Sequence, residues 1–133
     1  MSAVQKAVIG TLKASANMRE VFGDPVRVFD ADTEVPYFPY VRLERHESVP
    51  SDASLSRGEA HTLQIAVMSR RTGLAGAREA LNAVKGALAE AEWAVAGHHV
   101  VLAHVTYADT MRAPGRDTWR GLVRLKMITE ETA

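Results

Sequence analysis

The hydrophobic pattern changes its period between Leu63 and Leu88. Leu63, Ile65 and Val67 alternate with smaller or more polar residues, as expected for a strand with one buried face. After the break Arg71–Gly73, apolar residues recur every three or four positions, which is the period of an amphipathic helix. These residues are Leu74, Ala77, Leu81, Val84, Leu88 and Ala91. The pattern predicts a long strand followed directly by a long helix, whose apolar stripe is covered by a sheet.

The rest of the chain predicts a second helix and further strands. We expect a helix from Ser2 to Ala14, with Ser2 as its N-cap and with Val4, Val8, Ile9 and Leu12 on its buried face. Residues 17–25 have the composition of a turn region. The predicted strands cover residues 26–29, about 40–47, 59–69, about 99–108 and about 118–128. The sequence therefore predicts one α/β domain of the α+β type over residues 1–133, with a largely antiparallel sheet of about five strands and two helices packed on one of its faces.

Alternation along the strands also assigns side chains to faces. In the strand 40–47, Val41 and Leu43 point one way, and the opposite side carries Tyr40, Arg42, Glu44 and His46. In the strand 99–108, one face carries Val101, Ala103, Val105 and Tyr107. In the last strand, Trp119, Val123, Leu125 and Met127 share one side, and the other side is a basic ladder that contains Arg120, Leu122, Arg124, Lys126 and Ile128. We expect residues 129–133 to fray.

Two connections have the composition of turns. Pro114-Gly115 favours a tight turn at the tip of the last hairpin. Residues 48–58 are rich in serine and contain a proline and an aspartate, so they predict a long hairpin loop that is mobile when the protein is alone.

Composition excludes several classes of function. The chain has 133 residues, of which 47% are hydrophobic, and this is enough for a core without disulfide bonds. It has no cysteine, so thiol nucleophiles and thiolate metal sites are absent. Sixteen basic and sixteen acidic residues cancel, which gives no overall field for nucleic acid or an anionic membrane. The sequence shows no signal peptide and no apolar run of about 20 residues, so we expect synthesis in the cytoplasm and no membrane partner.

Candidate chemical motifs are incomplete. His98 and His104 would lie about 20 Å apart along one strand at roughly 3.3 Å per residue, so the histidines of this region cannot share one metal ion. The acids of residues 30–34 lack the glycine and the final acid of a calcium loop. Gly73-Leu74-Ala75-Gly76 lacks the lysine of a phosphate loop and fits the start of a helix. No Ser, His and Asp set can be assembled, so we expect no catalytic residues, no metal and no cofactor.

An ordered series of short motifs resembles the tail-terminator, or tail-completion, proteins of long-tailed phages and gene transfer agents. Its first half consists of an N-terminal helix, Val28-Phe29-Asp30, Phe38-Pro39-Tyr40-Val41-Arg42-Leu43, the serine-rich loop and Arg57-Gly58-Glu59 with His61. Its second half consists of Ser69-Arg70, the Ala-rich helix with Glu79-Ala80 and Ala87-Leu88, Gly97, Val105, Ala108-Asp109-Thr110, Pro114-Gly115-Arg116-Asp117, Trp119-Arg120-Gly121 and Thr129-Glu130. The series covers nearly the whole chain.

The resemblance implies a structural virion protein without enzymatic activity. Such proteins form a homohexameric ring at the head-proximal end of the tail tube, stop tube polymerisation and provide the surface for head-to-tail joining. The partners would be further copies of the chain, the tail-tube protein and the head connector or stopper, while DNA passes through the lumen without specific binding.

In a ring, charged sheet faces and loops become interface elements. The candidate assembly interface comprises Arg42, Glu44, His46, Ser51, Asp52, Ser54, Leu55, Arg57, Arg120, Arg124 and Lys126. A solvated face of an antiparallel sheet is the structural alternative for the charged positions.

Two other functional classes stay open at this point. One is a small soluble α/β ligand-binding module, which requires a concave apolar pocket with a few polar groups. The other is a hydrolase whose residues are scattered beyond sequence recognition.

Overall fold

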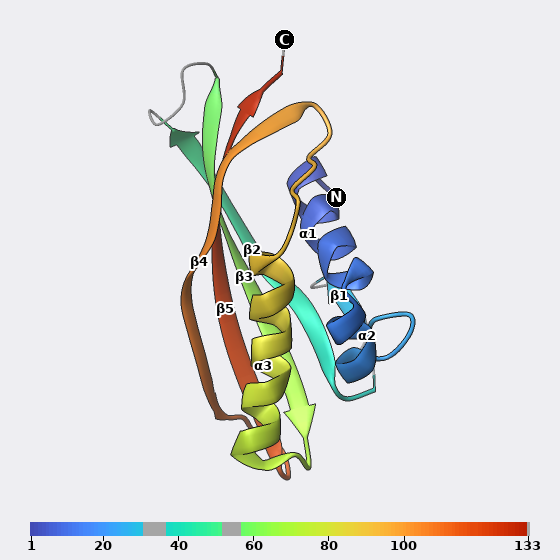
Figure 1. Cartoon of the computed structure of the whole chain (residues 1–133). Coiled ribbons are helices and arrows are strands. Elements are labelled where there is room, and N and C mark those ends of the chain that lie inside the picture. Colours follow the sequence, from blue (N-terminus) through green and yellow to red (C-terminus); the bar gives the residue numbers. More distant parts are fainter. Residues whose placement is uncertain (31–36, 52–56, 133) are drawn as a thin grey trace.

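A five-stranded sheet with three helices on one side forms the part of the chain that the computed structural model describes, namely residues 1–30, 37–51 and 57–132 (Figure 1). The elements are α1 (Ala3–Ala14), α2 (Ala16–Phe22), β1 (Val28–Asp30), β2 (Tyr40–Ser51), β3 (Gly58–Arg70), α3 (Gly73–Ala89), β4 (His98–Arg112) and β5 (Thr118–Glu131). The strand order is β1-β2-β3-β5-β4. β1 is parallel to β2, and the other neighbouring strands are antiparallel. The predicted α+β class and largely antiparallel sheet are confirmed.

Helix α1 begins as its sequence predicts. The Ser2 side chain accepts a hydrogen bond from the backbone N–H of Gln5, and the Gln5 side chain accepts one from the backbone N–H of Ser2. This reciprocal capping box satisfies backbone donors that the first turn leaves without partners. Val4, Val8 and Leu12 are buried, as expected from their spacing.

Helix α2 corrects the turn expected over residues 17–25. Its side-chain cap is Ser15, which accepts a hydrogen bond from the backbone N–H of Met18. Met18 and Phe22 are four positions apart, so both lie on one helical face, and both are fully buried. Two apolar anchors and a cap are sufficient for a seven-residue helix here because the core covers it.

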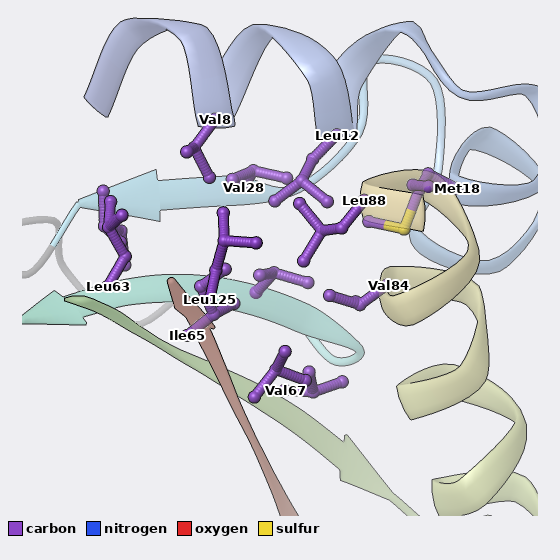
Figure 2. Packing of buried hydrophobic residues seen from close by; sticks show 14 of the residues in the cluster. Val8, Leu12, Met18, Val28, Leu63, Ile65, Val67, Val84, Leu88 and Leu125 are labelled. Atoms are coloured by element: carbon purple, nitrogen blue, oxygen red, sulfur yellow. The ribbon is translucent and has the colours of Figure 1, made fainter. Parts of the chain in front are cut away.

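The strand-to-helix unit predicted from the change of period is present as β3 and α3. Leu63, Ile65 and Val67 of β3 point toward the helices, and Val84 and Leu88 of α3 meet the same core (Figure 2). The apolar stripe of α3 is buried from Ala77 to Leu88, whereas its first member, Leu74, is 46% exposed. The helix therefore begins at the predicted place, and the stripe starts one turn later than expected.

Beta bulges change the predicted faces of β4. The register shifts between Val100 and Leu102 and again between Val105 and Tyr107. Val101 is the extra residue of the first bulge, and the second bulge reverses the alternation before Tyr107, so both are exposed and do not share a face with Ala103 and Val105. The residues of β4 that pack against the core are Val100, Ala103, Val105 and Ala108.

The strands are longer than the sequence indicates. β2 continues to Ser51, which pairs with Gly58, so residues 48–51 belong to a strand instead of a loop. β5 continues to Glu131, and Thr129 within the supposedly frayed tail is buried. The proposed calcium-like turn at residues 30–34 lies outside the described residues from position 31 onward.

Candidate assembly interface

The face of the sheet without helices carries most of the charged residues that the sequence singles out. Arg42 and Glu44 come from β2, and Arg120, Arg124 and Lys126 come from β5, with β3 between the two strands. We call this surface the open face. The predicted placement of these five side chains on one face is consistent with the register, since Arg42 pairs with Ala66, and Ala66 pairs with Leu122 between Arg120 and Arg124.

An ion pair crosses the open face above β3. The guanidinium Nη2 of Arg120 donates to both carboxylate oxygens of Glu44, and the longer of the two hydrogen bonds is 2.8 Å. The side chains are 31% and 23% exposed, so water screens the pair only in part. The small side chain of Ala66, which lines the same shallow hollow, leaves room for this contact across the strand.

Aromatic rings support two other cations of the open face. The guanidinium carbon of Arg124 lies 5.0 Å from the centroid of the Tyr107 ring, and that of Arg42 lies 5.5 Å from the centroid of the Tyr40 ring. Both distances fit a cation over an aromatic ring. Lys126 pairs in register with His104 of β4. The aromatic rings therefore orient the guanidinium groups of Arg42 and Arg124 before any partner binds.

Strand β4 adds exposed apolar side chains at the border of the open face. It is an edge strand of 15 residues. Four of its large apolar residues are between 41% and 54% exposed, namely Val101, Leu102, Tyr107 and Met111. A long edge strand with exposed apolar residues is a surface on which another chain can pair or pack. Sequence reasoning missed this row, because simple alternation placed Val101 and Tyr107 on the same face as Ala103 and Val105, which pack against the core.

His46 does not belong to the open face, which corrects its predicted grouping with Arg42 and Glu44. A bulge between Leu43 and Arg45 makes Glu44 an extra residue, so His46 pairs with Leu63 on the face that the helices cover. There His46 Nε2 lies 2.7 Å from His61 Nδ1. The simple alternation of the sequence contains no signal for this bulge.

Four side chains form a hydrogen-bonded chain at this place. Gln5 Nε2 lies 3.0 Å from His46 Nδ1, and His61 Nε2 lies 3.1 Å from Thr129 Oγ1. Since the Oε1 atom of Gln5 already accepts from Ser2, its Nε2 donates, and one consistent assignment has every donor point from Gln5 through His46 and His61 to Thr129. In that assignment both imidazoles are neutral, with the proton on Nε2.

Burial lowers the pKa of both histidines below the usual value of 6.5. For His46, burial is the larger cause, and the carboxylate of Glu59 opposes it. For His61, burial is again the largest cause, followed by the nearby His46, while Glu59 opposes these effects. The His61 Nε2 atom lies 3.7 Å from Glu59 Oε2, which is a favourable contact only for a protonated His61. The pair is therefore mainly neutral at pH 7.

Among the remaining predicted interface residues, Ser51 and Arg57 lie at the end of the sheet where β2 and β3 meet. Ser51 ends β2, and Arg57 precedes β3, with its guanidinium 4.0 Å from the Glu131 carboxylate. Asp52, Ser54 and Leu55 lie outside the described residues. The backbone N–H of Glu131 donates to the Arg57 carbonyl, which fixes the base of this hairpin against β5.

The described residues offer little for ligand chemistry. His98 and His99 are neighbours at the start of β4, His104 lies on the open face, and no three His, Asp or Glu side chains within ranges 1–30, 37–51 and 57–132 are arranged to hold a metal ion. None of the helices described in the structure is long and apolar enough to cross a membrane. The hollow beside Ala66 on the open face is open to solvent and is lined by Arg42, Glu44 and Arg120, unlike an enclosed apolar pocket.

Comparisons with known proteins agree with this architecture. The model of the family described as "Tail completion protein gp17" matches residues 6–130. A solved chain from "Virion of native gene transfer agent (GTA) particle" is 26% identical in sequence, with a TM-score of 0.82 over 96% of this chain and 94% of that chain. No match was found among curated proteins.

Proposed function

Because this chain belongs to the tail completion protein gp17 family and is a structural protein of the virion tail, we propose that it closes the head-proximal end of the tail tube as a ring of six copies. In this role the ring stops tube polymerisation and presents a joining surface to the head connector. The role is geometric, so it needs no catalytic residues and no cofactor. DNA passes through the lumen without specific binding.

The observation that carries the ring proposal is the open face together with the apolar row of β4. Within the described part of the chain, one side of the sheet has no helix on it, and the edge strand beside it exposes Val101, Leu102, Tyr107 and Met111. A ring contact is heterologous, which means that two different surfaces of neighbouring copies meet. We assign β4 and the open face to one side of that contact, because apolar area and oriented charge lie next to each other there.

The charged residues of the open face act as specificity elements in this proposal. Arg42, Glu44, Arg120, Arg124 and Lys126 stand on a rigid sheet, and aromatic rings or an ion pair orient four of them. Charges arranged in this way exclude wrong partners and fix the register of the right one more than they add affinity.

Light scattering and negative-stain imaging of the purified protein test the ring. We expect a monomer or a six-membered ring alone, and rings that cap tubes when tail-tube subunits are added. Leu102→Lys places a charge in the apolar row and should abolish rings, while Ala89→Lys at an exposed position of α3 should not. A stable dimer with twofold symmetry over a wide concentration range contradicts the proposal, because it uses an isologous contact.

The hairpin between β2 and β3 is the second part of the proposed interface, as an arm toward a neighbouring subunit, the tube or the connector. Ser51 and Arg57 mark its described ends, and Asp52, Ser54 and Leu55 belong to it in sequence. Replacing residues 52–56 with a Gly-Ser turn should leave the melting temperature nearly unchanged, because loop closure entropy varies slowly with length. Particles made with this variant should show unattached tails or abnormally long tubes. Normal yields of joined particles would reject the arm.

A further inference from the structure

Three arginines converge at the end of the sheet opposite the β2–β3 hairpin. Arg70 is the last residue of β3, Arg71 follows it, and Arg116 lies in the turn between β4 and β5. Together with Asp117 they line one open hollow of about 460 Å³. We call Arg70, Arg71 and Arg116 the arginine end. In Figure 1 this end lies where the tip of β3, the start of α3 and the β4–β5 hairpin come together.

Hydrogen bonds hold the two segments of the arginine end together. The backbone N–H of Arg71 donates to the carbonyl of Asp117 over 2.9 Å. Arg70 Nε donates to Thr118 Oγ1 over 3.3 Å, and its guanidinium carbon lies 4.1 Å from the centroid of the Phe38 ring. The Thr118 hydroxyl donates in turn to the Arg116 carbonyl. The backbone beneath the three cations is therefore set in the free protein, which lowers the entropy cost of binding.

Within the described residues, none of the three arginines of the arginine end has a carboxylate partner. Arg45, Arg57 and Arg120 each have a glutamate within 4.0 Å. Among residues 1–30, 37–51 and 57–132, by contrast, no hydrogen bond or ion pair engages the guanidinium of Arg71 or Arg116. Asp117 is the one acid among the residues that line the hollow, so three positive charges face one negative charge. The chain is neutral as a whole, and this end of it is basic.

The backbone of Arg71 supports a role for its side chain. Its φ is 63°, in the left-handed region that favours glycine, and the neighbouring Asp117 has a φ of 51°. Aspartate tolerates this region better than a long side chain does. Glycine would occupy the position of Arg71 with less backbone strain. Arginine at this position places a third guanidinium group beside those of Arg70 and Arg116.

We infer that the arginine end is a docking surface for an acidic protein surface. The inference rests on the proposed function, in which one end of the ring meets the tail tube and the other meets the head connector. Arginines adjoining aromatic residues are typical of protein interfaces, and Phe38 lies under Arg70 while the preceding residue, Tyr37, is 86% exposed. Planar guanidiniums bind carboxylates in pairs of hydrogen bonds.

A nucleic acid is the less suitable occupant of this surface. Strong binding to a phosphate backbone requires many basic contacts; the hollow provides three, and the neighbouring Arg120 of the open face is already paired with Glu44. The opposite end of the sheet carries Glu130 and Glu131 at the end of β5, where Glu131 lies 4.0 Å from Arg57, so acidic and basic side chains are mixed at that end.

The double variant Arg71→Gly with Arg116→Gln tests the inference, with Arg78→Gln as the matched control. Arg78 is an exposed arginine of α3 that does not line the hollow. Tail tubes and DNA-filled heads are purified from particles that lack this protein, and attachment of each protein to each component is measured by co-sedimentation. Binding to a 20-base-pair DNA duplex, of the order of two helical turns, is measured by fluorescence anisotropy in parallel.

We expect the double variant to bind one of the two components about tenfold more weakly than the wild type does, and to bind the other normally. Arg78→Gln should behave as the wild type. The melting temperature of the double variant should not fall, because glycine at position 71 relieves strain, and a normal ring mass will show that assembly itself is intact. Added salt should weaken the wild-type attachment that the variant loses.

Other results overturn the inference in distinguishable ways. If the double variant attaches to tail tubes and to heads as strongly as the wild type does, the arginine end is not a docking surface, and the proposed function is unaffected. A selective loss of DNA binding with normal attachment makes the surface a nucleic-acid contact instead. If the wild-type protein itself attaches to neither heads nor tubes, the proposed function fails together with the inference.

Discussion

The two faces of the sheet differ in what their side chains do. On the covered face, Leu63, Ile65 and Leu125 are at most 1% exposed and pack against the helices. On the open face, β5 carries Arg120, paired with Glu44 of β2, and Arg124, which lies over Tyr107 of β4. Successive residues of one strand therefore serve different purposes: one set supplies the free energy of folding, and the other set is available for partners.

The largest effect is expected from a truncation on the covered face. Leu125→Ala should lower the free energy of unfolding by about 2 to 5 kcal/mol, because the leucine is fully buried between β3, β4 and the helices and its removal leaves a cavity. Urea unfolding measures the change. A loss below about 0.5 kcal/mol, the size expected of an ordinary surface substitution, would mean that this face does not carry the fold.

The next prediction concerns His46 and His61, which are polar residues on the largely apolar covered face. Because the pKa of His46 and of His61 is lowered by burial in the folded protein, the unfolded chain binds more protons as the pH falls below 6.5. The contribution of the His46–His61 pair to the free energy of unfolding is therefore fully present above pH 6.5. It is lost as the pH falls through the pKa values that the two histidines have in the folded protein. We expect urea midpoints to drop between about pH 7 and pH 5.

Histidine variants separate this effect from general acid destabilisation. His104→Gln, on the open face, should keep the pH dependence, whereas His46→Gln should reduce it. Equal slopes for these two variants would show that the His46–His61 pair does not determine the response. The prediction also requires protonation to break the hydrogen bonds from Gln5 to His46 and from His46 to His61, because both Nδ1 atoms act as acceptors in the neutral chain.

The sequence predicted those parts of the fold in which an uninterrupted period determines the structure. The alternation of β3 and β5, the stripe of α3 and the cap at Ser2 depend on neighbours in the chain, so their spacing was sufficient. The family resemblance rests on the order of short motifs and is confirmed by the match over residues 6–130.

The parts that the sequence did not predict depend on single extra residues or on tertiary cover. The bulge at Glu44 moved His46 beside His61, and the bulges of β4 exposed Val101 and Tyr107. A bulge residue has no distinctive residue type, and it moves every later side chain of the strand to the opposite face. A prediction from strict alternation of faces therefore cannot detect it. Helix α2 is short, and its stability comes from buried Met18 and Phe22, which a local pattern underestimates.

The ion pair of the open face should contribute a smaller stability term. A double-mutant cycle with Glu44→Gln and Arg120→Gln should give a coupling of about 1 kcal/mol, because two charge-assisted hydrogen bonds form in a partly exposed position. The coupling should shrink with added salt, since water and ions reach both side chains. A coupling near zero at low salt would mean that the pair orients the open face without stabilising it.

The smallest effect on folding is expected for Leu102→Ala, which is the counterpart of Leu125→Ala on the other side of the sheet. Leu102 is 41% exposed at the edge strand, so its truncation should change the free energy of unfolding by less than about 1 kcal/mol. If β4 forms the proposed ring contact, the same variant should shift the ring toward monomers, because it removes apolar area that a neighbouring copy would cover. Light scattering over a range of concentrations measures that shift, and His99→Ala, at another exposed position of β4, serves as the control.

A loss of stability as large as that of Leu125→Ala would show that the open face belongs to the core. An unchanged ring with unchanged stability would remove Leu102 from the interface and leave the charged residues of the open face as its remaining candidates.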